Sequence, residues 1–201
     1  MICRCGWSRA AVAERLVPAL ALLLALLCGG GANALESGQA LPGVRVEELG
    51  ELKLHDEQLS YAAWDSRALL GKLNVIQYLA ARLSSKSLNK PFTDQLEAAG
   101  LPLDRYHVTT IVNLDDALFG TRGFVQSELE SNKKRYYLSS IVADARGLGL
   151  RTWQLAPESS AIIIVDADGR VVFFRDGALS ADEIAAALQL LRDGTAELAA
   201  R

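Results

Sequence analysis

The sequence predicts an α/β fold: a mixed sheet with helices on both of its faces. Two runs rich in β-branched and apolar residues, Leu73–Leu79 and Tyr106–Leu114, flank a stretch with helical periodicity. This strand–helix–strand order requires parallel pairing through a right-handed crossover. Near the end of the chain, two further β-rich runs flank an Asp-Gly pair at 168–169, which predicts an antiparallel hairpin in the same sheet.

The first part of the predicted domain supplies a hairpin and a buried strand. Apolar and polar residues alternate over 44–54 around Gly50, which indicates a two-stranded hairpin with one buried face. Tyr61 and Trp64 are expected in the loop or short helix that follows. The apolar run 73–79 then predicts a buried strand.

Helical patterns alternate with the next strands. Apolar residues at helical spacing predict a helix from about Ser85 to Ala99, in which Pro91 marks either a later start or a kink. The strand 106–114 follows, and then a helix over about 123–134. A third strand is predicted over Ser140–Asp144.

The C-terminal part predicts a hairpin and a final helix. Its strands are Ala161–Asp166 and Val171–Phe174. Ser180 and Glu183 have the spacing of a capping box, and apolar residues at helical spacing follow them. Residues beyond Asp193 are expected to fray.

The first 34 residues differ in composition from the rest and are predicted to be a cleaved signal peptide. Three Arg flank the start of the apolar run Leu16–Leu27, and a small-residue stretch ends in an A-x-A site at 32–34. The run is shorter than the roughly 20 residues that span a bilayer. Cleavage after Ala34 would leave one periplasmic domain, 35–201, with no stable membrane insertion. The alternatives are an uncleaved anchor and a lipoprotein modified at Cys28.

Charge and cysteine content narrow the function classes. The formal net charge is −3, and removal of three Arg and one Glu with the leader makes the remainder more acidic, so nucleic acid is not an expected partner. The three cysteines, Cys3, Cys5 and Cys28, all lie in the leader. The mature domain would therefore contain no thiol, and its core is large enough to be stable without disulfides.

The chain resembles the thioredoxin-like superfamily, in the branch with an added N-terminal β-hairpin. The resemblance rests on the element order, on Gly71-Lys72 before the first buried strand, on the Asp166–Gly169 turn and on Gly177 before the final helix. Within the superfamily it is similar to the bacterial YtfJ family of exported proteins. The stretches that carry this similarity are 104–125, 130–140 and 153–171. The resemblance implies a fold and brings no established activity.

The redox motif of that superfamily is missing here. Thioredoxin-type catalysis uses a Cys-x-x-Cys at the end of the first parallel strand, where a helix N-terminus stabilises the thiolate. Aligned on the strand, the two positions fall near Leu83 and Lys86, which form no thiolate. The superfamily's cis-proline falls at Ser159 or Ser160, unless the loop shifts Pro157 into its place. We therefore expect neither thiol–disulfide exchange nor thiol peroxidase activity.

We predict instead a binding site at the face where the redox motif would lie. Arg82 and Lys86 bring positive charge to the opening of a helix, where free amide groups attract anions. The predicted binding residues are Arg82, Ser84, Ser85, Lys86, Glu158, Ser159 and Ser160. The ligand would be a peptide, an envelope protein or a small anion, with no cofactor and no metal. The simpler interpretation is that Ser84 or Ser85 caps the helix while both cations are solvated.

Other polar clusters have ordinary structural explanations. The pair 115–116 follows a strand end, where open α/β sheets place ligands, but a loop also explains it. The turn 166–168 resembles half a calcium loop and fits a hairpin equally. His55 and His107 lack metal spacing, and the basic run 133–135 suits either a partner or a helix C-terminus. The alternative function is a cysteine-independent enzyme that uses the same cleft.

Overall fold

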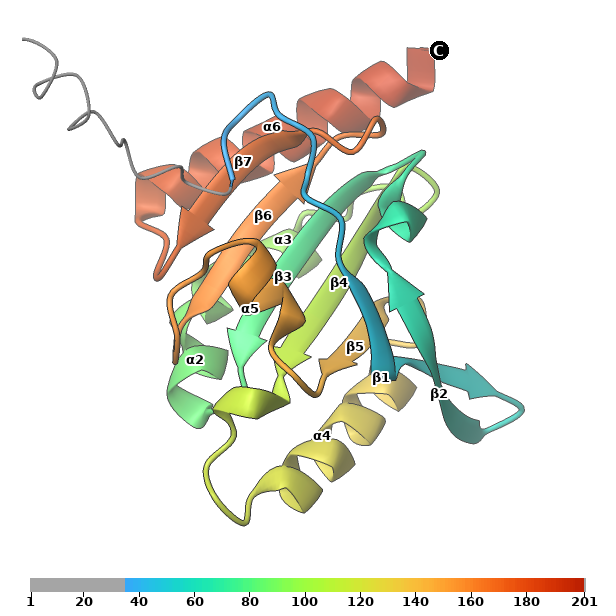
Figure 1. The fold of residues 1–201 in the computed structure, drawn as a ribbon. Helices are drawn as coiled ribbons and strands as arrows, with labels where there is room; N and C mark the ends of the chain where they lie inside the picture. Colours follow the sequence, from blue (N-terminus) through green and yellow to red (C-terminus); the bar gives the residue numbers. More distant parts are fainter. Residues whose placement is uncertain (1–34, 201) are drawn as a thin grey trace, which may run out of the picture. The chain divides into compact units, whose positions relative to one another are not determined.

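The computed structural model describes residues 35–200. The predicted signal peptide, its cleavage site and Cys28 lie outside the described residues. One seven-stranded sheet has the order β2-β1-β5-β4-β3-β6-β7, with helices on both faces (Figure 1). The predicted α/β class with a mixed sheet is confirmed. Within residues 35–200, we find no helix that is both long and apolar enough to cross a membrane.

The elements follow one another with short connections. The strands are β1 (Arg45–His55), β2 (Gln58–Asp65), β3 (Leu73–Ala80), β4 (Tyr106–Asn113), β5 (Ser140–Asp144), β6 (Ser160–Val165) and β7 (Val171–Asp176). The helices are α2 (Leu83–Leu88), α3 (Lys90–Ala98), α4 (Arg122–Arg135), α5 (Leu148–Thr152) and α6 (Ala181–Ala200), with 3₁₀ turns η1 (Ser66–Leu69) and η2 (Leu114–Asp116). Strands β3, β4 and β5 are parallel to one another, whereas β1, β2, β6 and β7 form antiparallel pairs.

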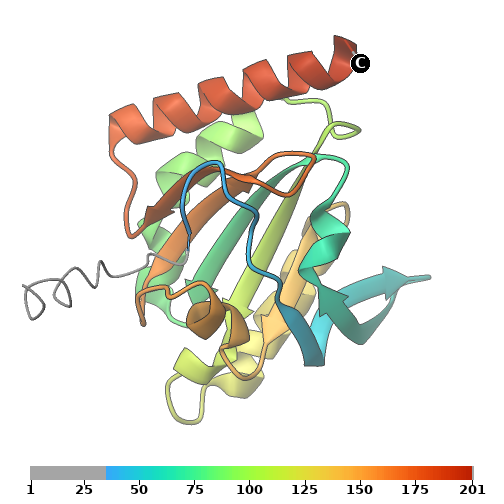
Figure 2. The ribbon, with the colours of Figure 1, turned by 45° about the horizontal axis from the view of Figure 1, so that its top comes forward.

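Strand β3 lies inside the sheet, between β4 and β6, and its side chains pack on both faces. On one face, Val75 packs in a cluster with Phe92 of α3 and with the apolar stripe of α6. Figure 2 shows α3 and α6 lying together over this face. On the other face, Ile76 and Tyr78 belong to a cluster that includes Trp153, whose ring meets that of Tyr78 edge-on with 5.9 Å between centroids. Both layers of helices are therefore fixed to the same strand.

The strands and helices after β3 agree closely with the sequence prediction. Strand β5 has the predicted bounds, and α4 extends the predicted helix by one residue at each end. The Asp-Gly hairpin between β6 and β7 is confirmed, because Gly169 has a φ of 78° and its N–H donates to the Asp166 carbonyl at 3.0 Å. The capping box is also confirmed: Ser180 and Glu183 exchange backbone-to-side-chain hydrogen bonds of 2.8 and 3.2 Å.

The predicted hairpin around Gly50 is wrong, because β1 continues through this residue. The turn lies at Asp56 and Glu57, whose φ angles of 46° and 64° suit a two-residue turn of type I′. Gly50 instead lies in an irregular part of β1, between residues 46 and 51, where the register with β2 shifts. Tyr61 and Trp64 consequently lie on β2 rather than in a loop or helix.

The predicted helix over 85–99 is two helices, because the chain breaks at Asn89 (φ −109°, ψ 19°). Pro91 lies in the first turn of α3, where its missing N–H costs no helical hydrogen bond. Helix α5 is an element that the sequence did not predict.

The end of α6 is ordered, contrary to the prediction that it frays beyond Asp193. Thr195 is buried, and its hydroxyl donates to the Leu191 carbonyl at 2.8 Å. A Cβ placed at Gly194 would lie only 2.6 Å from Leu73 Cδ1, so the glycine permits the helix to approach β3 closely. Packing against the sheet therefore holds this part of the helix.

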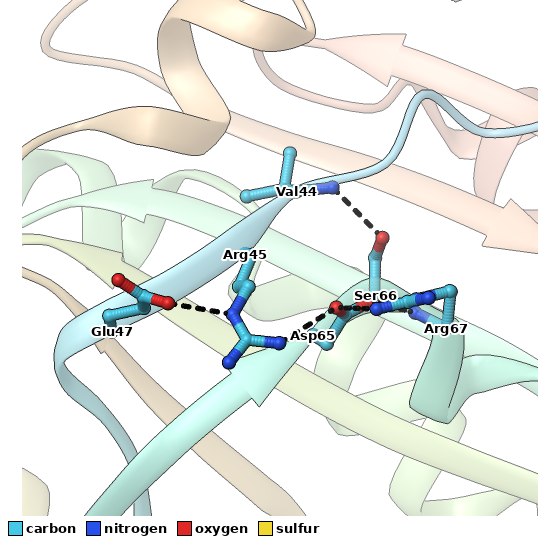
Figure 3. A network of polar contacts seen from close by, with 6 residues as sticks. All are labelled: Val44, Arg45, Glu47, Asp65, Ser66 and Arg67. Atoms are coloured by element: carbon cyan, nitrogen blue, oxygen red, sulfur yellow. Dashed lines mark hydrogen bonds and ion pairs between the residues drawn. The ribbon is translucent and has the colours of Figure 1, made fainter.

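Polar contacts join the start of β1 to the end of β2 (Figure 3). The carboxylate of Asp65 accepts hydrogen bonds from the backbone and side chain of Arg67 and lies 3.8 Å from Arg45. These bonds with Arg67 hold the pKa of Asp65 well below its usual range. Ser66 Oγ accepts a hydrogen bond from the Val44 N–H at 3.0 Å.

Replacement of Gly50 tests the strand irregularity. Gly50→Ala should lower the free energy of unfolding by about 2 kcal/mol or more, because φ is 77° and the new Cβ would lie 2.2 Å from the Ala62 carbonyl oxygen. Urea denaturation measures the change. Gly43→Ala is the control: it meets no atom within 4 Å, so its effect should stay within about 0.5 kcal/mol. Equal effects of the two substitutions would contradict the assignment.

Candidate functional site

The candidate site lies where β3 ends and α2 begins. Arg82 occupies the cap position of α2 with extended backbone (φ −136°, ψ 147°), and no side chain caps the helix. Because β6 runs antiparallel to β3, Ser160 pairs with Leu79 near the end of β3. The topology therefore places the segment 158–160 beside the start of α2 and brings the two groups of predicted site residues together.

Arg82 is bound within the chain. Its Nη2 lies 2.7 Å from Glu158 Oε1, and its Nε donates to the Asp116 carbonyl at 3.0 Å. Glu158 has a φ of 58°, and its backbone N–H donates to Asp116 Oδ2 at 3.3 Å. Arg82 and Glu158 thus tie the start of α2, η2 and the loop before β6 to one another.

The two predicted serines do not cap α2. Ser85 is buried, and its hydroxyl donates to the Glu158 carbonyl at 2.8 Å, while Ser84 is exposed. Lys86 forms an ion pair with Glu128 of α4. The predicted serine cap of α2 is therefore wrong. Both cations have a carboxylate partner, but the side chain of Lys86 is still 54% exposed.

Asn89 is a site residue that the sequence did not indicate. It is buried, and its Nδ2 donates to Ser160 Oγ at 3.2 Å and to the Gly177 carbonyl at 3.0 Å. Its Oδ1 accepts from the Leu179 N–H at 3.0 Å. The Ser160 hydroxyl is thus part of a structural network, and Ser159 is held by its carbonyl, which accepts the Ala80 N–H. The signal in the sequence was a polar Asn-Lys-Pro run inside an otherwise helical pattern.

Large apolar side chains are exposed at this end of the sheet. Leu83 in the first turn of α2 is 76% exposed, and Phe124 in the first turn of α4 is 70% exposed. The loop before α4 exposes Leu118 and, fully, Phe119. We refer to these four residues, Leu83, Leu118, Phe119 and Phe124, as the apolar rim. The sequence signal was an apolar pair beside Gly120 in a loop.

Two contacts bring the segments of the apolar rim together. The ion pair of Lys86 with Glu128 joins α2 to α4. Leu83 precedes Lys86, and Phe124 precedes Glu128, by about one helical turn. The hydrogen bond from Arg82 to the Asp116 carbonyl joins α2 to η2, and the loop of the rim follows η2 directly. Figure 1 shows α2, η2 and the start of α4 at the same end of the sheet.

A hollow beneath this surface is too tight for a ligand. Its lining includes Tyr78, Asp116, Ser159 and Asp176, and it has no space for even a water molecule. Burial, together with the nearby charge of Asp144, raises the pKa of Tyr78 far above its usual value.

The remaining predicted clusters lie away from the start of α2. His55 is exposed beside Asp56 at the β1–β2 turn. His107 lies at the start of β4 and pairs with Asn74 at the start of β3, at the opposite end of that strand from α2. In the described part of the chain, no group of three His, Cys, Asp or Glu residues is placed to hold a metal. Lys133 is buried and donates to two carbonyls after α4, as expected for a cation at a helix C-terminus.

A protein-family model described as "Bacterial protein of unknown function (YtfJ_HI0045)" matches residues 35–194. The chain belongs to this family. It is 43% identical over 175 residues to YtfJ of Escherichia coli K12, and the match covers 85% of this chain and 95% of that protein. A protein of Haemophilus influenzae Rd is 34% identical, with 84% and 95% covered. Both relatives are described as uncharacterized.

Comparison with solved structures gives a thioredoxin-like fold. A thiol-disulfide isomerase from Corynebacterium glutamicum is 15% identical with a TM-score of 0.50, and the match covers 75% of this chain and 95% of that one. A reduced 2-Cys peroxiredoxin from Plasmodium vivax is 12% identical with a TM-score of 0.50, covering 78% and 82%. These likenesses concern the fold alone. In this family member, Leu83 and Lys86 occupy the first turn of α2, and residues 35–201 contain no cysteine.

The Asn89 network can be tested by substitution. Asn89→Ala should lower the free energy of unfolding by about 2–4 kcal/mol, because it leaves buried backbone groups without partners. Asn89→Asp keeps an acceptor for Leu179 and should be destabilising through the loss of its donors. Ser87→Ala on the exposed side of α2 is the control, and a loss as small as that of the control would rule out the structural role of Asn89.

The pH dependence of stability should reveal His107. Burial, aided by the charge of Lys72, lowers the pKa of His107 below the ordinary histidine value of 6.5, although the charge of Glu51 opposes this. Below that pH the unfolded chain binds a proton that the folded chain does not, so the free energy of unfolding should fall as the pH drops from about 7 to about 5. His107→Gln should reduce this slope in urea denaturation, whereas the exposed His55→Gln should not. An unchanged slope in His107→Gln would refute this.

Proposed function

We propose that the chain is an exported binding protein without thiol redox activity, which docks its partner at the apolar rim. The observation that carries the proposal is the exposure of four large apolar side chains on α2, on the loop after η2 and on the start of α4, which the contacts Lys86–Glu128 and Arg82–Asp116 join. Exposed apolar groups that gather at one place on a soluble domain are typical of interaction surfaces. The partner we propose is a protein or extended peptide segment that presents apolar side chains.

The charges at the site favour this partner over a small anion. Arg82 is paired with Glu158, and Lys86 is paired with Glu128. An anion would have to separate these pairs or bind beside their carboxylates, which repel it. An apolar segment would bury the rim and leave the ion pairs at its edge, where charged groups contribute to specificity.

Export and redox inactivity belong to the same proposal. The support for export is the leader composition, with its A-x-A site before Leu35. The support for redox inactivity is that residues 35–201 lack cysteine and that Leu83 and Lys86 stand where the superfamily's motif would lie. A cysteine-independent enzyme is the alternative, but the Asp116 carboxylate already accepts hydrogen bonds from Asn113 and from the Glu158 backbone.

Selection of random peptides displayed on phage would test docking at the rim. We expect enrichment of peptides with aromatic and aliphatic residues. The double variant Leu83→Ser/Phe119→Ser should weaken their binding by about tenfold or more, since buried apolar contacts dominate such interfaces. Binding is measured by fluorescence polarisation with the selected peptides.

A matched control removes apolar surface at the opposite end of the sheet. Leu103 and Tyr137 are 55% and 63% exposed, and they precede the parallel strands β4 and β5 rather than following a strand end. Leu103→Ser/Tyr137→Ser should change peptide affinity by less than about twofold. Failure to enrich any peptide, or equal losses in the two double variants, would overturn the proposal.

A further inference from the structure

The two edges of the sheet differ in how far other segments of the chain pair with them. At the β7 edge, the segment before β1 runs alongside the strand: Gly38 N–H donates to the Val171 carbonyl at 2.7 Å, and Val171 N–H donates to the Gln39 carbonyl at 2.8 Å. Ala40 also bridges to Arg170. At the other edge, β2 pairs with β1 alone among the described elements. One edge is therefore covered in part, and the other is open.

Alternate residues of β2 direct their backbone groups to the open side. The two-residue turn makes His55 and Gln58 a hydrogen-bonded pair, and the pairing with β1 continues at every second residue. The N–H and C=O groups of Leu59, Tyr61 and Ala63 consequently point away from β1. Open edges of this kind are templates for pairing with another strand.

The composition of β2 offers no protection against such pairing. Natural edge strands carry lysine, proline or inward charges that prevent association. The run Gln58–Trp64 contains neither a charged residue nor a proline. The tip of the β1–β2 hairpin extends beyond α4 in both views (Figures 1 and 2), while the side chains of Leu59 and Tyr61 pack in the cluster to which α4 contributes Leu129.

We propose that β2 pairs antiparallel with β2 of a second copy of this chain, around a two-fold axis at Tyr61. In this register Leu59 lies opposite Ala63 of the other copy, a large side chain beside a small one, and the two Tyr61 residues face each other. Ser60 lies opposite Ala62 of the other copy. An interface of this kind is isologous, as in most dimers of identical chains. The two sheets would form one continuous sheet.

The ends of the paired strands bring two acidic residues opposite each other, which opposes pairing unless nearby cations offset them. The same register places Glu57 opposite Asp65 of the second copy, but Asp65 is already held by Arg67 and Arg45 (Figure 3). The side chain of Arg67 is 77% exposed and can receive the approaching carboxylate. The neutral centre of the strand brings no like charges together, which distinguishes a second copy from a strongly charged partner strand.

Sedimentation velocity and amide hydrogen exchange would test this pairing on protein purified from bacteria that express the complete chain. We expect a monomer–dimer equilibrium that shifts with concentration. In the dimer the amides of Leu59, Tyr61 and Ala63 should become protected, whereas those of Ser60 and Ala62 should be protected at all concentrations by β1. This alternating pattern reports the edge and the register together.

A charge at the edge should dissociate the dimer. Ala63→Lys should raise the dissociation constant by about tenfold or more, because each lysine would enter the shared strand pair. Ala178→Lys adds the same charge to the exposed loop before α6 and should leave the equilibrium unchanged. The proposal would be overturned if the protein were a monomer at all concentrations. It would also be overturned if Ala63→Lys left a dimer intact and the amides of Leu59, Tyr61 and Ala63 were unprotected in that dimer. Neither result bears on peptide binding at the apolar rim.

Discussion

The rest of the structure depends on the burial of β3 on both faces. Every residue of this strand except Gln77 is buried. Asn74 is buried and polar, and its side-chain amide donates to the carbonyls of Leu69 and Lys72. A strand of this kind must have a neighbour on each side and a layer on each face. Parallel β4 demands a crossover, which α2 and α3 supply over the face that α6 also covers. The end of β3 is therefore a junction where a strand end, a helix start and the loop into β6 must meet.

The strands of the central sheet could be predicted from the sequence because their signal is local. Runs of β-branched and apolar residues set β3, β4 and β5, and an Asp-Gly pair set the late hairpin. Gly50 was ambiguous, since a glycine suits a turn or a bulge. What decides between them is the carbonyl of Ala62, which belongs to the next strand. The break at Asn89 likewise depends on partners more than 70 residues further along the chain.

The candidate site shows the same division between local and distant information. Topology alone predicts that Arg82 and Glu158 lie close together, because β6 returns beside β3. Their ion pair, and that of Lys86 with Glu128, depend on side-chain geometry that no spacing encodes. The apolar rim was missed for another reason. Phe119 lies in a short loop, where sequence patterns do not distinguish an exposed aromatic residue from a buried one.

The contacts inside the site explain why its surface can be apolar. Ser85 and Arg82 both bind Glu158, one through the carbonyl and one through the carboxylate, so the loop before β6 is fixed without a disulfide. With these polar groups satisfied within the chain, docking of a partner at the rim would desolvate few unpaired charges. The exposed Leu83 would then contribute to such docking through the burial of its apolar side chain.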